Sequence, residues 1–136
     1  MENMDKPIGY WIKHLHALVE GSLDDLLAGQ GVTRRHWQVM NVLFKRPRSV
    51  ADLDAELGPF LSEEEPSLRP YVEALRGKGW LTPAEPVDLT EEGRRAHAAL
   101  LEQVSATRAK VTDGISPEEY RSTIDVLTRM SANLGG

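Results

Sequence analysis

The sequence has 136 residues, a formal net charge of −5 and no cysteine. This length fits one domain, and the negative charge argues against adhesion to nucleic acid or anionic membrane through charge alone. Without cysteine, disulfides, thiolate metal sites and thiol chemistry are excluded. No apolar run reaches the ~20 residues that span a bilayer, and the first residues lack the order of a secretory signal. We therefore expect a soluble, cytoplasmic protein with no membrane partner.

Capping residues and apolar spacing predict three helices in the first part of the chain. The first begins at Pro7 and ends near the glycines of "AGQG", residues 28 to 31. Thr33 is placed to cap the second, "RRHWQVMNVLFK", which Pro47 stops. Ser49 opens a short third helix that Gly58 closes.

Two prolines determine how the next stretch, "PFLSEEEPSLRPYVEALRGKGWL", is divided. A helix running from Ser62 would hold Pro70 in its interior, at a cost of ~3 kcal/mol. A cap at Ser67 places Pro70 in the first turn, where its missing N–H has no intrahelical partner. We therefore predict a separate acidic turn over residues 62 to 66, followed by a helix that ends at "GKGW".

The remaining segments predict a small hairpin and two long helices. "WLTPAEPVDL" offers two short extended pieces around a proline-rich turn. Thr90 caps a helix over residues 91 to 112, and Ser116 opens a last helix through "SPEEY", which has the order of a capping box. The fold class is mainly α: three core helices and a very short β-hairpin form a winged helix-turn-helix, flanked by N- and C-terminal helices.

Four segments, "TRRHWQVMNVL", "SVADLDAELG", "VEALRGKGWL" and "VDLTEEGRRAHAALL", resemble consecutive parts of the MarR family of bacterial transcription regulators. The resemblance implies a homodimer joined by its first and last helices, residues 1–31 and 91–136. It implies a DNA-binding core at 32–90 that reads a pseudo-palindromic site in double-stranded DNA. It also implies a small aromatic or anionic ligand in the cleft between the two parts.

The sequence departs from the family pattern in its wing and beside its recognition helix. Members of the family usually carry a longer hairpin with an arginine at the tip, whereas "TPAEPVD" is short and holds no basic residue. Over residues 48 to 92, four basic side chains stand against eleven acidic ones, a net charge of −7. Weak and only mildly salt-sensitive DNA binding is therefore expected.

The candidate DNA-binding residues are polar or basic side chains near the two helices of the helix-turn-helix that is expected to contact DNA. Arg69 is the only basic residue at the start of the recognition helix and is the candidate for a guanine edge. An alternative for Arg69 is a surface ion pair with the glutamates, and for Arg46 and Arg48 a solvated loop. The full set is Arg34, Arg35, Arg46, Arg48, Ser49, Ser67 and Arg69.

Aromatic residues and histidines gather on the first two helices, where the resemblance places a ligand cleft. Tryptophans at helical spacing are more often core or dimer packing, whereas a histidine beside an apolar seam can change charge near neutral pH. The candidate ligand-binding residues are Tyr10, Trp11, His14, His36, Trp37 and Met40.

Nothing in the sequence predicts an enzyme, a metal site or a cofactor. His14 and His16 point to different sides of a helix, and no nucleophile or phosphate-binding glycine loop stands out. The first functional hypothesis is a dimeric, ligand-responsive transcription regulator. The alternative is a winged-helix protein with weak or lost DNA binding that acts as a protein-interaction or small-molecule-binding module.

Overall fold

The computed structural model describes residues 5–136, and its named elements are six α-helices and the 3₁₀ turn η2. In chain order these are α1 (Ile8–Ala28), α2 (Arg34–Lys45), α3 (Val50–Glu56), η2 (Gly58–Phe60), α4 (Arg69–Gly77), α5 (Glu91–Val111) and α6 (Pro117–Asn133). The chain divides into two compact units, one ending at Val104 and the other running from Ser105 to Gly136. None of the described helices is long and apolar enough to cross a membrane.

The predicted helix starts at Ser49, Thr90 and Ser116 are confirmed by their hydrogen bonds. The Ser49 hydroxyl accepts from the Asp52 N–H at 3.1 Å, and the Thr90 hydroxyl accepts from the Gly93 N–H at 3.0 Å. Ser116 and Glu119 form a reciprocal capping box at the start of α6, and the hydrogen bonds to Ser116 lower the pKa of Glu119. These bonds satisfy donors that each helix would otherwise leave without partners.

The division at the prolines is also confirmed, with one change at the cap. Residues 62 to 66 form a turn in which the Ser62 N–H donates to the Glu65 carbonyl at 3.0 Å. Pro70 lies in the first turn of α4, but the cap position is Leu68 and the helix begins at Arg69. The prediction of Ser67 as the cap is therefore wrong by one residue.

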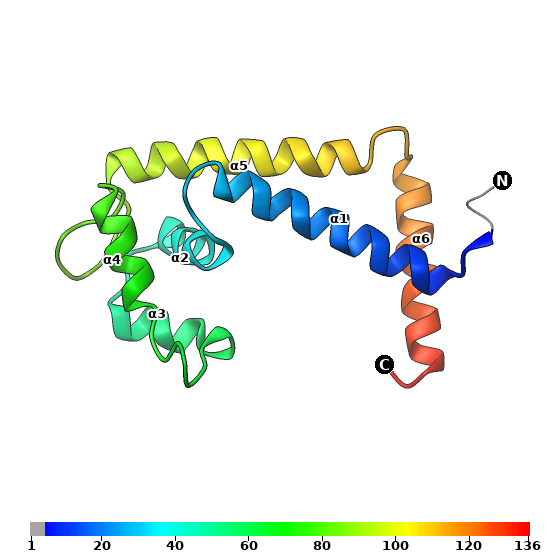
Figure 1. The fold of residues 1–136 in the computed structure, drawn as a ribbon, viewed down its shortest axis with the longest axis horizontal. Coiled ribbons are helices and arrows are strands. Elements are labelled where there is room, and N and C mark those ends of the chain that lie inside the picture. Colours follow the sequence, from blue (N-terminus) through cyan, green and yellow to red (C-terminus); the bar gives the residue numbers. More distant parts are fainter. Residues whose placement is uncertain (1–4) are drawn as a thin grey trace. The chain divides into compact units, whose positions relative to one another are not determined.

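The core of the first unit lies where α2, α3 and α4 meet the end of α1 and the start of α5 (Figure 1). Trp37, Met40 and Leu43 of α2 and Leu75 of α4 are buried there, together with Leu100 of α5. Phe44, in the last turn of α2, is half exposed, while Val39 is fully buried. The first half of α1 extends away from this core, and its apolar side chains are exposed.

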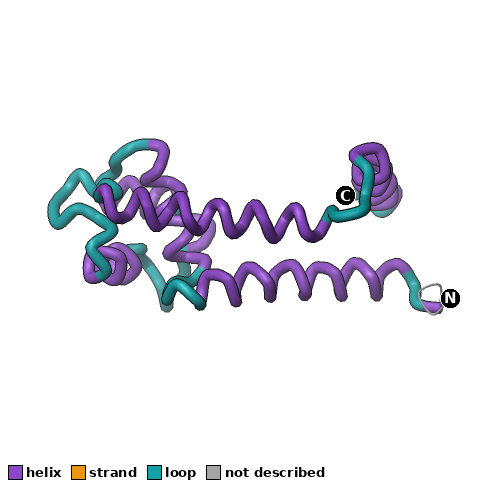
Figure 2. Tube along the Cα trace, turned by 90° about the horizontal axis from the view of Figure 1, so that it is seen from above, coloured by secondary structure: helices purple, strands orange, loops and turns teal. Residues whose placement is uncertain are grey.

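The wing is smaller than a hairpin with two strands. Within residues 5–136 no strand forms, and Figure 2 shows helices and loops only. Leu81 pairs with Leu89 in one antiparallel bridge, and Arg48 pairs with Val87 in another. The second bridge ties the wing to the segment between α2 and α3.

Candidate nucleic-acid interface

The first turn of α4 presents one arginine to solvent. Arg69, the first residue of the helix, is exposed, as is Pro70 beside it. Among the described residues Arg69 forms no ion pair and no side-chain hydrogen bond, so the ion pair with the neighbouring glutamates is not formed. Its guanidinium is free to meet a ligand.

Asp54 of α3 holds the chain at the start of α4. Its carboxylate accepts from the Ser67 hydroxyl at 2.8 Å and from the Leu68 N–H at 2.7 Å. The Ser67 oxygen in turn accepts from the Arg69 N–H at 3.1 Å. In this arrangement Ser67, expected at the DNA surface, orients the beginning of α4.

Arg48 does not lie in a solvated loop, so that interpretation of it is wrong. Its side chain is only 6% exposed and pairs with the Glu56 carboxylate at 2.8 Å. The guanidinium also donates to the Val42 carbonyl, and to the Arg46 carbonyl at 2.7 Å. Val42 lies in the last turn of α2, where carbonyls lack intrahelical partners. Arg48 thus joins the end of α2 to α3.

Two other arginines of the candidate set have partners within the fold. Arg34 pairs with Glu20 and with Asp24 of α1, the latter at 2.6 Å, and hydrogen bonds to Asp24 and Glu20 raise its pKa. Arg35 donates to Gln38 at 2.8 Å and its guanidinium lies 5.2 Å from the centre of the Phe60 ring. These contacts fix the start of α2.

The segment after α2 leaves one cation accessible. The side chain of Arg46 is 65% exposed, and its guanidinium lies 3.7 Å from the Glu56 carboxylate. The Ser49 hydroxyl is used as the cap of α3. Of the candidate set, Arg69 and Arg46 are therefore the most accessible arginines.

The wing turns back onto α3. The Glu85 carboxylate accepts from the Val50 N–H at 2.8 Å, at the start of that helix. Asp88 accepts from Arg94 of α5 at 3.0 Å. Both contacts use acidic side chains, and the exposed tip at residues 83 to 86 has no basic residue.

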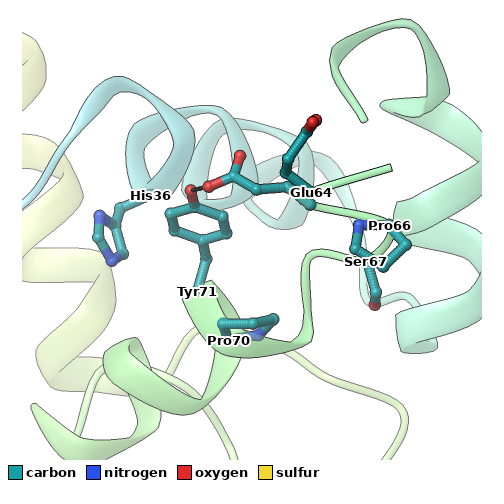
Figure 3. Close-up of a pocket in the computed structure, with 7 residues that line it drawn as sticks. His36, Glu64, Pro66, Ser67, Pro70 and Tyr71 are labelled. Atoms are coloured by element: carbon teal, nitrogen blue, oxygen red, sulfur yellow. Dashed lines mark hydrogen bonds between the residues drawn. The ribbon is translucent and has the colours of Figure 1, made fainter. Parts of the chain in front are cut away.

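A cavity of about 340 Å³ opens between the start of α2, the acidic turn and the first turn of α4. The Tyr71 hydroxyl donates to Glu65 across this cavity, and the rings of Tyr71 and His36 meet edge to face at 4.9 Å (Figure 3). Burial, and to a lesser extent Lys78, lowers the pKa of His36. His36 is the one residue of the ligand-binding set that lines this cavity.

The six candidate ligand residues do not form a single site. Tyr10, Trp11 and His14 contact one another on the first half of α1, with the Tyr10 and His14 rings stacked at 5.5 Å. Trp37 and Met40 are buried in the core. Leu26, near the end of α1, packs against this core, and Tyr10 lies roughly 24 Å from it along the helix, at about 1.5 Å per residue. The expectation of one aromatic cluster is therefore wrong for the single chain.

No protein-family model matches the chain. Solved structures do resemble it over nearly its whole length. A MarR-family protein of Mycobacterium tuberculosis in complex with DNA is 21% identical, with a TM-score of 0.68 over 96% of this chain and 99% of that one. CouR of Rhodococcus jostii RHA1, bound to p-coumaroyl-CoA, is 21% identical, with a TM-score of 0.63 over 93% and 92%. The Mycobacterium tuberculosis MarR-family protein in complex with salicylic acid is 20% identical, with a TM-score of 0.60 over 91% and 98%.

The chain has the MarR-family fold. The winged helix-turn-helix predicted from the sequence is thereby confirmed, with α4 as its last core helix. Among the described residues of this MarR fold, no three histidine or acidic side chains gather in a way that could hold a metal ion.

One buried polar group of this MarR fold was missed by the sequence analysis. His97 of α5 is 2% exposed and lies between the rings of Trp37 and Phe44, at 5.0 and 4.5 Å. Its Nε2 lies 2.8 Å from Asn41 Oδ1, while its Nδ1 is buried without a partner among the described residues. Burial, and then Arg94, lowers its pKa. The spacing of Gly93, His97, Leu100 and Val104 on one helix face was the available signal.

Proposed function

We propose that this protein is a DNA-binding transcriptional regulator that reads its site with α4. The observation that carries the proposal is the exposed, unpaired Arg69 at the first position of α4, in a fold shared with a protein whose structure contains DNA. In winged helix-turn-helix proteins the corresponding helix enters the major groove, and arginine pairs with guanine edges there.

Phosphate contacts in the proposed complex come from few side chains. Arg46 is accessible, and Arg35 lies at the start of α2. We leave Arg48 out of this surface because its guanidinium is buried, and we assign Arg34 and Ser67 to holding the fold. Ser49 is half-buried and caps α3, and its contact with DNA stays a prediction. The acidic turn and the wing add negative charge, so the proposed affinity is modest and depends on each remaining cation.

The proposed regulator is a homodimer. Large apolar side chains that remain exposed follow one another along two helices at helical spacing. They are Ile8, Trp11, Ile12, Leu15, Leu18 and Val19 on α1, and Tyr120, Ile124 and Met130 on α6. Soluble monomers rarely leave such stripes in water. A second copy of the chain would cover them and would place two copies of α4 on a pseudo-palindromic site.

A small ligand is part of the proposal because similar structures hold p-coumaroyl-CoA and salicylic acid. His36 borders a cavity next to α4, so a ligand in this cavity would contact the helix that is proposed to bind DNA. Tyr10, Trp11 and His14 remain predicted ligand residues on α1.

The test compares two exposed arginines by the affinity for DNA that flanks the protein's own gene. We expect Arg69→Ala to weaken binding by about 1–3 kcal/mol, roughly 5- to 150-fold, because a bidentate base contact is lost. Arg121→Ala is the control: Arg121 is 74% exposed on α6, outside the proposed surface. Equal affinities of the two variants would refute the role of Arg69. No binding by the wild-type chain would favour the alternative of a protein-interaction or small-molecule-binding module.

A further inference from the structure

The cavity beside α4 has the size and the walls of a small-molecule site. Its volume of about 340 Å³ falls in the lower part of the range of ~300–1,000 Å³ found for ligand pockets. Its lining combines two aromatic rings, two proline rings and two carboxylates: His36, Tyr71, Pro66, Pro70, Glu64 and Glu65. Figure 3 shows these groups arranged around one space, with Tyr71 between His36 and the acidic turn.

The charge of this lining is negative. Glu64 and Glu65 are acidic, and no lysine or arginine belongs to the lining. Burial lowers the pKa of His36 and so disfavours a positive charge on its ring, and its Nδ1 accepts from the Thr33 N–H at 2.9 Å. A carboxylate ligand would meet like charge here, whereas a cation would meet opposite charge.

Two basic side chains lie close enough for their charge to act on the lining residues Tyr71 and His36, but neither belongs to the lining itself. The guanidinium of Arg35, which approaches Tyr71, lies over the Phe60 ring and donates to Gln38. Lys78 Nζ donates to the Gln30 carbonyl at 3.4 Å. Neither supplies a cation to neutralise the two glutamates by a direct ion pair in the described structure.

Acceptors and apolar surface lie side by side in the cavity. Glu65 uses one oxygen to accept from Tyr71, and Glu64 has no hydrogen bond or ion pair within residues 5–136. The Tyr71 ring offers a face suited to a cation, and Pro66 and Pro70 offer apolar contact. We propose that this cavity binds a small organic amine, with its ammonium group at Glu64 and Glu65 and its apolar part against Tyr71 and the two prolines.

This ligand class differs from the carboxylic and thioester ligands of the similar structures. It also gives the acidic turn a role. Because Ser67, Pro70 and Tyr71 lie at the start of α4, an amine that joins them to Glu64 would fix the acidic turn against that helix. The effect on DNA rests on the proposed function, whereas the binding of an amine does not.

The binding test uses the full chain without DNA, by isothermal titration. The probes are phenethylamine, tryptamine and benzylamine, each compared with 3-phenylpropionate, which carries the opposite charge. We expect at least one amine to bind about tenfold more tightly than the acid. Glu64→Gln and Glu65→Gln should each raise the dissociation constant of that amine by about two- to fivefold, since partly exposed ion pairs are individually weak, and the double variant by about tenfold.

Glu63→Gln is the matched control, because Glu63 belongs to the same turn but not to the lining, and it should change the constant less than about twofold. The proposal is overturned if no amine binds at about 5 mM, if the double variant binds as the wild type does, or if the acid binds as tightly as the amine. An amine that binds but leaves DNA affinity unchanged supports the site and overturns its link to α4. If the wild-type chain binds the amine but binds no DNA, that result counts against the proposed function and leaves the amine site standing.

Discussion

Arg48→Ala separates a buried structural arginine from a DNA contact. The substitution removes the two-nitrogen contact with Glu56 and the donors to the Val42 and Arg46 carbonyls. Charge-assisted hydrogen bonds contribute about 1.5–3 kcal/mol, and removing one partner of a buried ion pair costs about 3–5 kcal/mol. Because Glu56 is 36% exposed and can be solvated, we expect a loss of about 2–4 kcal/mol.

The assay is urea unfolding at one fixed protein concentration, since an oligomer's stability depends on concentration. The expected loss corresponds to a fall in melting temperature of about 6–12 °C. Arg46→Ala is the matched control from the same loop: its side chain is 65% exposed, so the free energy of unfolding should change by less than about 0.5 kcal/mol. If Arg48→Ala keeps its stability and loses DNA affinity, the structural role assigned to Arg48 is wrong.

Three further predictions concern packing, titration and assembly. A Cβ on Gly93 would lie 2.1 Å from the Trp80 carbonyl oxygen, so Gly93→Ala should lower the free energy of unfolding by about 2–4 kcal/mol. Gly21 in α1 has open space around it, so Gly21→Ala should raise the free energy of unfolding by up to about 1 kcal/mol. Equal effects of the two substitutions in thermal melts would refute the close approach at Gly93. Because burial lowers the pKa of His97 below its ordinary value of 6.5, the unfolded chain takes up the proton first, and stability should fall as pH drops through about 6.5 and level off below the folded-state pKa. His97→Gln should flatten this part of the profile of stability against pH, and an unchanged profile would contradict the role given to His97. His36, whose pKa burial also lowers, contributes to the profile in the same direction. Leu15→Glu or Ile124→Glu should convert the proposed dimer to a monomer in analytical ultracentrifugation, because each puts a charge among the exposed apolar side chains. Arg121→Ala should leave the dimer intact. Dimers in both glutamate variants would argue against an interface formed by the apolar side chains of α1 and α6.

Local chemistry made the helices predictable. Thr90 and Ser116 mark helix starts through caps that involve only the next three residues, and Pro70 restricts the backbone wherever it stands. The start of α4 was misplaced by one residue because its orientation comes from Asp54, thirteen residues before Ser67. A capping side chain from another helix leaves no mark in the local pattern.

The accessibility of the candidate DNA-binding residues was predictable only where a residue acts alone. Arg69 needs no partner, and its exposed position agrees with its place in the sequence. Arg48 and His97 depend on partners that the fold brings from elsewhere, Glu56 for the first and Trp37 with Asn41 for the second. Helical spacing could place His97 on the buried face of α5, but it could not show the rings on either side.

The central claim is that α4 reads DNA, and the most direct measurement is the affinity of the wild-type chain for DNA flanking its own gene over a salt series. The account predicts specific binding that weakens as salt rises, with a slope of log K against log [salt] of about −3 to −5, because few cations remain free to contact phosphates. The contradicting result is no binding at about 50 mM salt, or equal affinity for an unrelated sequence of the same length.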